Sequence, residues 1–223
     1  EEQRVAGYPT SPPVVIRTPL TTWVVAVLGP AAPWVLRSLI LITAICAMIR
    51  FEHIAKSRAE WILASFLVAG SLGVFAHPRA VVLAEAWACC LIVLSLVIYR
   101  KDRYLPAVIL GFLAVSFREI AIPYLAVMFL CSLRRSRKES LAWGLAIALS
   151  LGLYAAHWIA ADRAAEGATS VASPGWLWFG GWPYVVDTFG FSSLLRPLPY
   201  EAWVFLLALA IFGWVGTQGE YRV

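Results

Sequence analysis

The stretch VSFREIAIPY, residues 115–124, places Arg118 and Glu119 side by side in a run from 104 to 133 that has no other charged residue. A charged side chain in the hydrocarbon of a membrane costs roughly 2.5–3.5 kcal/mol on insertion scales. Two adjacent charges in such a run therefore need a structural or a functional reason. The surrounding sequence indicates how the run folds and what the charges are for.

The composition indicates a membrane protein. Of the 223 residues, 61% are hydrophobic and 14% are charged, whereas soluble domains contain about 25% charged residues. Apolar runs of about 17–22 residues recur along the chain, which predicts an all-α, polytopic bundle of transmembrane helices, forming one domain over 1–223. Soluble classes are excluded. The net charge of +5 does not indicate nucleic-acid binding, because the basic residues cluster between the apolar runs, where they orient the chain.

The predicted spans are the apolar runs between charged loops. They cover residues 34–49, 61–76, 80–99, 141–161 and 202–215. Segment 20–28 is too short to cross the bilayer and is expected to lie at the interface or to be partly inserted. A large outer loop, 162–200, precedes the last span. Its part from 175 to 200 holds eight aromatic residues, which form either an aromatic belt or a wall for an amphipathic ligand.

The basic loops predict how the run 104–133 folds. Ten of the 18 Lys and Arg residues lie in three short loops, 50–58, 100–103 and 134–138, which favours a cytoplasmic location for all three. The run between the last two must then leave and return on one side. Two shorter helices that turn at 116–119 achieve this. A single long, tilted helix remains an alternative.

The turn between these helices is expected at a polar cavity. Residues 105–117 rise only about 20 Å as a helix, against about 30 Å of hydrocarbon, so Arg118 and Glu119 would lie below the outer boundary. Charge and irregular backbone are tolerated at that depth only inside protein or beside a water-filled cavity. The pair thus predicts a cavity open to the outer face. A purely structural ion bridge is the alternative.

Three other charged residues are candidates for the same site. Glu85, within VVLAEAWACC, is expected to face the cavity or to pair with an arginine such as Arg79 or Arg118. Arg17 and Arg79 lie in outer segments, where orientation does not require them, and guanidinium groups match phosphate. With Arg118 they are candidates to bind an anion. The three histidines and four cysteines lack metal-ligand spacing, so no metal site is expected.

Two segments resemble the GT-C class of membrane glycosyltransferases. In EEQRVAGYPTSPPVVIRTPLTTWVVAVLG, the elements Gly7-Tyr8-Pro9 and Arg17-Thr18-Pro19 are similar to the end of that family's first outer loop. In HPRAVVLAEAWACCLIVLSLVIYRKDRYLPAVILGFLAVSFREIAIPYLAVMFL, an acid early in one span, a basic loop and paired short helices with a basic outer turn are similar too. The likeness covers roughly 7–138.

The resemblance implies a bacterial inner-membrane enzyme with its site facing the periplasm or exterior. It would transfer a sugar from a polyprenyl-phosphate donor to a glycan, lipid or protein acceptor, among membrane lipids and without a cofactor. In that family a basic residue near the outer turn holds the carrier phosphate, a role that falls on Arg118. Arg17 and Arg79 are further phosphate-binding candidates, and Glu85 and Glu119 are cavity residues.

The family's catalytic base is an acid of the first outer loop, which here would lie upstream of Glu1. The sequence is therefore expected to be a fragment that lacks the N-terminal span and a C-terminal part, which leaves its own activity open. Two other functions remain as alternatives. Intramembrane charges and broken helices also suit a transporter of lipids or lipid-linked sugars. A non-enzymatic membrane scaffold is the third possibility.

Overall fold

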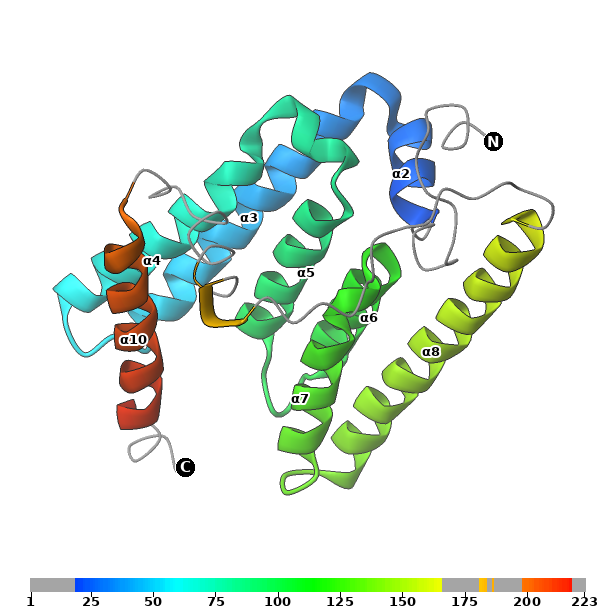
Figure 1. Ribbon diagram of the computed structural model, residues 1–223. Coiled ribbons are helices and arrows are strands. Elements are labelled where there is room, and N and C mark those ends of the chain that lie inside the picture. The colour runs from blue at the N-terminus through cyan, green and yellow to red at the C-terminus, as the bar shows by residue number, and fades with distance from the viewer. Residues whose placement is uncertain (1–18, 166–180, 184–185, 187–197, 218–223) are drawn as a thin grey trace. The chain divides into compact units, whose positions relative to one another are not determined.

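The computed structural model describes residues 19–165, 181–183, 186 and 198–217, and every regular element in these ranges is a helix (Figure 1). The chain divides into two units, Glu1–Pro174 and Gly175–Val223. The first contains α2 (Leu20–Leu28), α3 (Ala32–Glu52), α4 (Arg58–Gly73), α5 (Ala84–Ile98), α6 (Leu105–Phe117), α7 (Ile122–Ser132) and α8 (Arg137–Ala165). The second contains α10 (Tyr200–Thr217). The predicted all-α class is confirmed.

Short 3₁₀ helices connect several of these elements. They are η2 (Gly29–Ala31), η3 (Val74–Ala76), η4 (Pro78–Val82) and η5 (Glu119–Ala121). Local sequence explains where the longer helices begin. Helices α3, α6 and α7 each carry a proline in the first two positions, where the missing N–H is not needed. Ser57 caps α4 by accepting a hydrogen bond from the N–H of Glu60.

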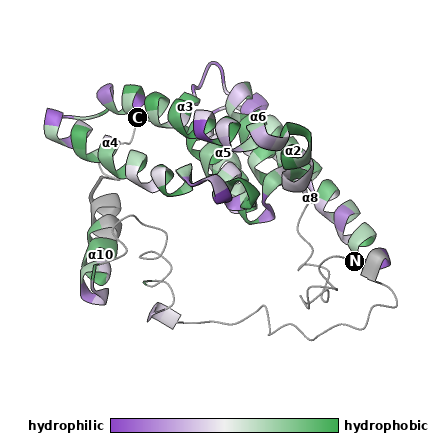
Figure 2. Cartoon of the chain, turned by 90° about the horizontal axis from the view of Figure 1, so that it is seen from above, coloured by the Kyte–Doolittle hydropathy of each residue, from purple (hydrophilic) through white to green (hydrophobic). Residues whose placement is uncertain are grey.

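In the described part of the chain, three helical segments are long and apolar enough to cross a membrane. They are Leu20–Glu52, Arg58–Ala76 and Arg137–Arg163. At most 28% of the residues in their most apolar windows are buried inside the protein, so much of their apolar surface faces outward. Figure 2 shows hydrophobic residues along α3, α4 and α5 and hydrophilic residues in the turns that join them. Outward-facing apolar helices of this length indicate a membrane protein.

Two predicted segments differ in detail from the observed helices. The segment 20–28 forms α2, but Gly29 adopts a left-handed φ of 51° and separates it from α3. The predicted span 80–99 is shorter than expected, because residues up to Val82 form η4 and α5 has only 15 residues. A helix of 15 residues rises about 22 Å, less than the hydrocarbon thickness of about 30 Å.

The run 104–133 forms two helices, as the basic loops predict. Helix α6 ends at Phe117, Arg118 is extended with φ −149° and ψ 115°, and α7 begins at Ile122. Pro123 has no N–H to continue the hydrogen-bond ladder through the turn. One long tilted helix is therefore excluded. In Figure 1 the chain ascends along α6 and descends along α7, so the turns before and after this pair lie at the same end.

Small residues allow these helices to approach closely. A Cβ atom on Gly111 of α6 would lie 2.9 Å from Leu125 of α7 and 3.1 Å from Trp143 of α8. Ala107 and Ala114, one turn away on either side, are completely buried. Such small residues are typical of helix interfaces in membranes, where close backbone approach supplies the packing energy. The α6–α7 pair is thus held firmly against α8.

Candidate functional site

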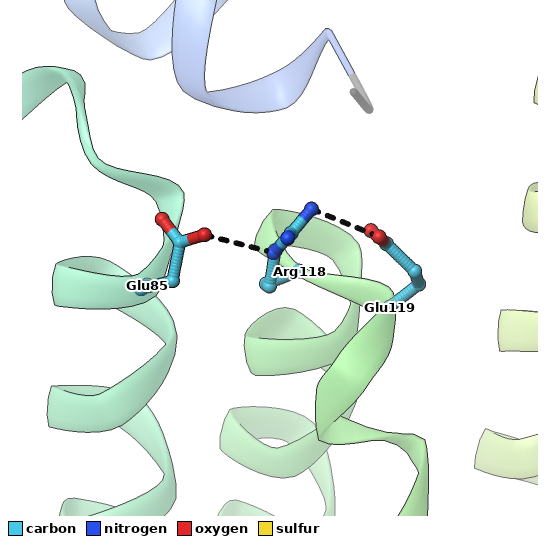
Figure 3. A network of polar contacts seen from close by, with 3 residues as sticks. All are labelled: Glu85, Arg118 and Glu119. Carbon is cyan, nitrogen blue, oxygen red and sulfur yellow. Dashed lines mark hydrogen bonds and ion pairs between the residues drawn. The ribbon is translucent and has the colours of Figure 1, made fainter. Parts of the chain in front are cut away.

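Glu85, Arg118 and Glu119 form a network of charges where α5 begins and α6 ends (Figure 3). Nε of Arg118 lies 3.0 Å from Oε1 of Glu85, and Nη1 of Arg118 lies 2.9 Å from Oε1 of Glu119. The contact to Glu119 is a hydrogen bond. The contact to Glu85 is an ion pair by distance, without the N–H alignment of a hydrogen bond. One guanidinium therefore lies between two carboxylates.

The ends of two antiparallel helices favour this arrangement. Glu85 lies in the first turn of α5, where the helix dipole stabilises an acid. Arg118 is the C-cap of α6, where the dipole stabilises a base, and its backbone N–H donates to the carbonyl of Ala114. The two helix ends lie side by side (Figure 3). Sequence position alone thus gives each charge a favourable field before the ion pair forms.

Two aromatic residues fix the distance between the helix ends. The rings of Trp87 and Phe117 are stacked, with centroids 5.5 Å apart and an interplanar angle of 5°. Trp87 is two residues from Glu85, and Phe117 precedes Arg118 directly. Nε1–H of Trp87 also donates to the carbonyl of Val81, at 2.9 Å. This buried pair therefore positions the carboxylate of α5 beside the guanidinium of α6.

The network is partly withdrawn from solvent, and its charges do not cancel. The side chains of Arg118, Glu119 and Glu85 are 18%, 22% and 37% exposed. With both acids ionised, the three residues carry a formal charge of −1. Oε2 of Glu119 is buried and has no hydrogen-bond partner among the described residues. A buried carboxylate oxygen without a partner is costly, so a ligand that donates a hydrogen bond there would be favoured.

A cavity of about 560 Å³ adjoins Glu119. It lies among the start of α2, the end of α6 and the middle of α8. Its lining residues are Pro19, Leu20, Trp23, Leu113, Val115, Ser116, Glu119, Ser150, Leu153, Tyr154, His157 and Ala160. Most of these lining residues are apolar, and Glu119 is the one acidic residue among them. Arg118 and Glu85 are not part of the lining. Ligand pockets of this size typically combine an apolar wall with a few polar groups.

Few polar groups in the cavity are available to a ligand. The hydroxyls of Ser116 and Ser150 donate to carbonyls of their own helices, at 3.0 Å and 2.8 Å. The hydroxyl of Tyr154 forms no hydrogen bond within the described part of the chain. Among the acid and hydroxyl groups of the cavity, Oε2 of Glu119 and the phenol of Tyr154 remain without a hydrogen bond to a described residue. These groups suit a ligand with hydroxyls at one end and an apolar body.

The structure brings together three of the five predicted site residues. Glu85 pairs with Arg118, which is one of the two partners the sequence suggests, and Glu119 joins them. Arg79 does not join them: it is exposed in η4 and forms no ion pair with any described residue. Arg17 lies outside the described residues, as do Glu1 and most of the aromatic segment 175–200.

A second buried cluster has no counterpart among the predicted residues. Glu139 is 1% exposed, and Oε1 accepts a hydrogen bond of 2.7 Å from the hydroxyl of Tyr99, in the turn after α5. That hydroxyl in turn accepts from Nη1 of Arg135, at 2.6 Å. Burial, followed by the bond to Glu139, raises the pKa of Tyr99 to about 12, so the phenol stays neutral. The sequence feature that could have indicated this cluster is Glu139, a single acid that follows four basic residues at the start of an apolar helix.

No group of three His, Cys, Asp or Glu residues that could hold a metal ion comes together in the described part of the chain. The chain has no match among known family models, curated proteins or solved structures.

Proposed function

We propose that this chain is part of a membrane-embedded glycosyltransferase of the GT-C class. It would transfer a sugar from a polyprenyl-phosphate carrier to an acceptor on the outer face of the membrane. The observation that supports this proposal is the cavity of about 560 Å³ beside Glu119. Its apolar wall suits the lipid part of such a donor, and its polar end suits the sugar.

Glu119 is the residue of this cavity that we expect to contact the sugar. A carboxylate oxygen accepts hydrogen bonds from hydroxyl groups, and Oε2 of Glu119 has no other partner among the residues that the structure describes. Arg118 donates to the other oxygen at 2.9 Å, which leaves Oε2 as the acceptor for a sugar hydroxyl. In this proposal Arg118 orients Glu119, and Glu85 holds Arg118 from the opposite side.

The role of Arg118 as a phosphate clamp is harder to combine with this geometry. A phosphate would approach a network that already carries a formal charge of −1. It would have to displace one carboxylate before the guanidinium could bind it in a fork. In the proposed enzyme, Arg17 or Arg79 would bind the phosphate. An acid upstream of Glu1 would remove the proton from the acceptor. An exposed guanidinium such as Arg79 is open to an anion.

Sugar transfer by the full-length protein tests the proposal. Membranes containing wild type, Glu119→Gln, Arg118→Lys or the control Glu52→Gln would be supplied with labelled polyprenyl-phosphate sugars. Glu52 is an exposed acid at the end of α3. We expect transfer to fall about 30-fold in Glu119→Gln, which corresponds to the loss of one hydrogen bond to a charged group, about 2 kcal/mol. Folding of each variant is checked by its elution in detergent.

Each outcome has a distinct meaning. Unchanged transfer by a well-folded Glu119→Gln variant would remove this cavity from the reaction. A loss of transfer in Glu52→Gln as well would show that the assay reports on stability. If wild type transfers no sugar from several donors but moves a labelled lipid-linked sugar across vesicles, the protein is a transporter. The interrupted pair α6–α7 is the feature that favours this second function.

A further inference from the structure

A groove of about 540 Å³ lies between α7 and the first half of α8, away from the cavity at Glu119. Its walls are apolar: Phe129 and Leu133 come from the end of α7, and Leu141 and Leu145 come from α8. Leu141 and Leu145 are 66% and 60% exposed. Arg137, the first residue of α8, lines one end of the groove.

Gly144 keeps the groove open. A Cβ atom at this position would lie 3.3 Å from the ring of Phe129, so a larger side chain would occupy the space in front of that ring. At Gly152, the next glycine of the same helix, an added Cβ atom would meet no described atom within 4 Å. The two glycines therefore differ in what a side chain would block, although both lie in α8.

The basic end of the groove is the most positive of the three turns. Residues 134–139 contain four basic residues and one acid, a formal charge of +3, against +2 for 100–103 and +1 for 50–60. That acid, Glu139, is buried against Tyr99. Arg134, Arg137 and Lys138 are exposed and form no ion pair with the rest of the described chain. Their charge is thus available to an anion.

The groove has the length of one leaflet. From Arg137 to Ala148, the lining residue of α8 farthest from that end, the helix rises about 16 Å. The hydrocarbon core is about 30 Å thick, so this is close to half of it. An acyl chain that starts at Arg137 would therefore follow the groove to the region of the bilayer centre.

We propose that this groove binds one anionic glycerophospholipid. One acyl chain lies between α7 and α8, and the phosphate lies against Arg137, with Arg134 and Lys138 close by. A guanidinium offers paired donors to phosphate oxygens. Basic pockets between transmembrane helices are known to bind acidic head groups. The site is independent of the proposed sugar transfer, since it shares no residue with the cavity at Glu119.

Native mass spectrometry of the full chain in detergent tests this site. The protein would be mixed with dioleoyl phosphatidylglycerol or with dioleoyl phosphatidylcholine, which has the same acyl chains and no net charge. We expect wild type to retain the anionic lipid preferentially. Arg137→Gln should bind it about fivefold more weakly, as expected for the loss of one basic residue at a membrane surface.

Substitutions at the two glycines distinguish binding in the groove from binding to the basic surface alone. Gly144→Leu should lose the bound lipid, whereas Gly152→Leu should retain it as wild type does. If Gly144→Leu retains the lipid, the acyl chain does not use the groove and the proposal is wrong. Equal retention of both lipids by wild type, or release of phosphatidylglycerol by millimolar glycerol phosphate, also overturns it. Elution and circular dichroism confirm that each variant is folded.

Discussion

Glu119 and Glu139 both lie beside arginines, but they differ in whether a carboxylate oxygen is buried without a hydrogen-bond partner. Glu139, at the start of α8, is 1% exposed, and neither of its oxygens is buried without a partner. Tyr99 connects it to Arg135. Glu119, at the turn after α6, keeps one buried oxygen that no described residue contacts by a hydrogen bond, next to a cavity. An acid without a buried, unpartnered oxygen suits a structural role, whereas the buried, unpartnered oxygen of Glu119 is available to a ligand.

Removal of Arg118 should have the largest effect on stability. Arg118→Leu leaves Glu85 and Glu119 close together without the cation between them. Breaking a buried ion pair from one side costs about 3 kcal/mol. We expect that loss in the free energy of unfolding, measured by circular dichroism in detergent. Arg79→Leu is the control, because Arg79 is exposed and has no ion pair in the described ranges. Equal effects of the two changes would show that the network does not stabilise the helix ends.

The second largest loss of stability is expected when the hydrogen bond to Glu139 is removed. Tyr99→Phe removes the hydrogen bond to Glu139 but keeps the ring on which Arg135 lies, 5.4 Å from the centroid. A hydrogen bond to a charged group contributes about 2 kcal/mol, and we expect a loss of that size. Tyr104→Phe is the matched control, since the hydroxyl of Tyr104 forms no hydrogen bond to the described residues. A loss as large in the control would remove the special role of Tyr99.

Changing each acid to its amide compares the two regions directly. Glu139→Gln should cost about 1 kcal/mol, because the charge at the start of α8 is favoured by the helix dipole. Glu119→Gln should change the free energy of unfolding by less than about 0.5 kcal/mol, since Arg118 keeps Glu85 as its partner. Thermal unfolding of both variants gives the comparison. A greater loss of stability in Glu119→Gln than in Glu139→Gln would show that Glu119, and not Glu139, is the acid that stabilises the fold.

The last prediction is a dependence of stability on alkaline pH. The pKa of Tyr99 is about 12 in the fold, against 10.0 for an ordinary tyrosine. Below pH 10 the phenol is protonated in both states, so its contribution is complete. Between pH 10 and 12 the unfolded chain loses the proton first, and the folded state is disfavoured. The stability of wild type relative to Tyr99→Phe should therefore shrink over this interval. A constant difference up to pH 12 would contradict the raised pKa.

Charge and length were sufficient to predict the fold of the α6–α7 pair. Three basic loops on one side required the run 104–133 to turn back, and the break occurs at Arg118, where Pro123 follows. The length of α5 could not be predicted in the same way. Residues 80–82 are apolar enough to join the helix, but they belong to η4, and the carbonyl of Val81 accepts from Trp87 instead.

The candidate site was predictable only in part. Adjacent charges in an apolar run pointed to Arg118 and Glu119, and an acid early in the preceding span pointed to Glu85. The cavity depends on side chains from α2 and α8, which no local pattern joins to α6. Tyr154 lines the same cavity as Glu119, and Tyr99 donates to Glu139; in both cases the two residues are more than 30 positions apart in the sequence. Such contacts follow from helix packing, which the charge pattern does not specify.

The short helices on either side of Arg118 also bear on how the chain enters a membrane. Helices α6 and α7 have 13 and 11 residues, and neither is long enough to cross by itself. Together they form one hairpin with the charged turn at its tip. Glu85 lies in the helix that precedes them in the chain. The ion pair of 3.0 Å thus joins the tip of this hairpin to the first turn of the helix made before it.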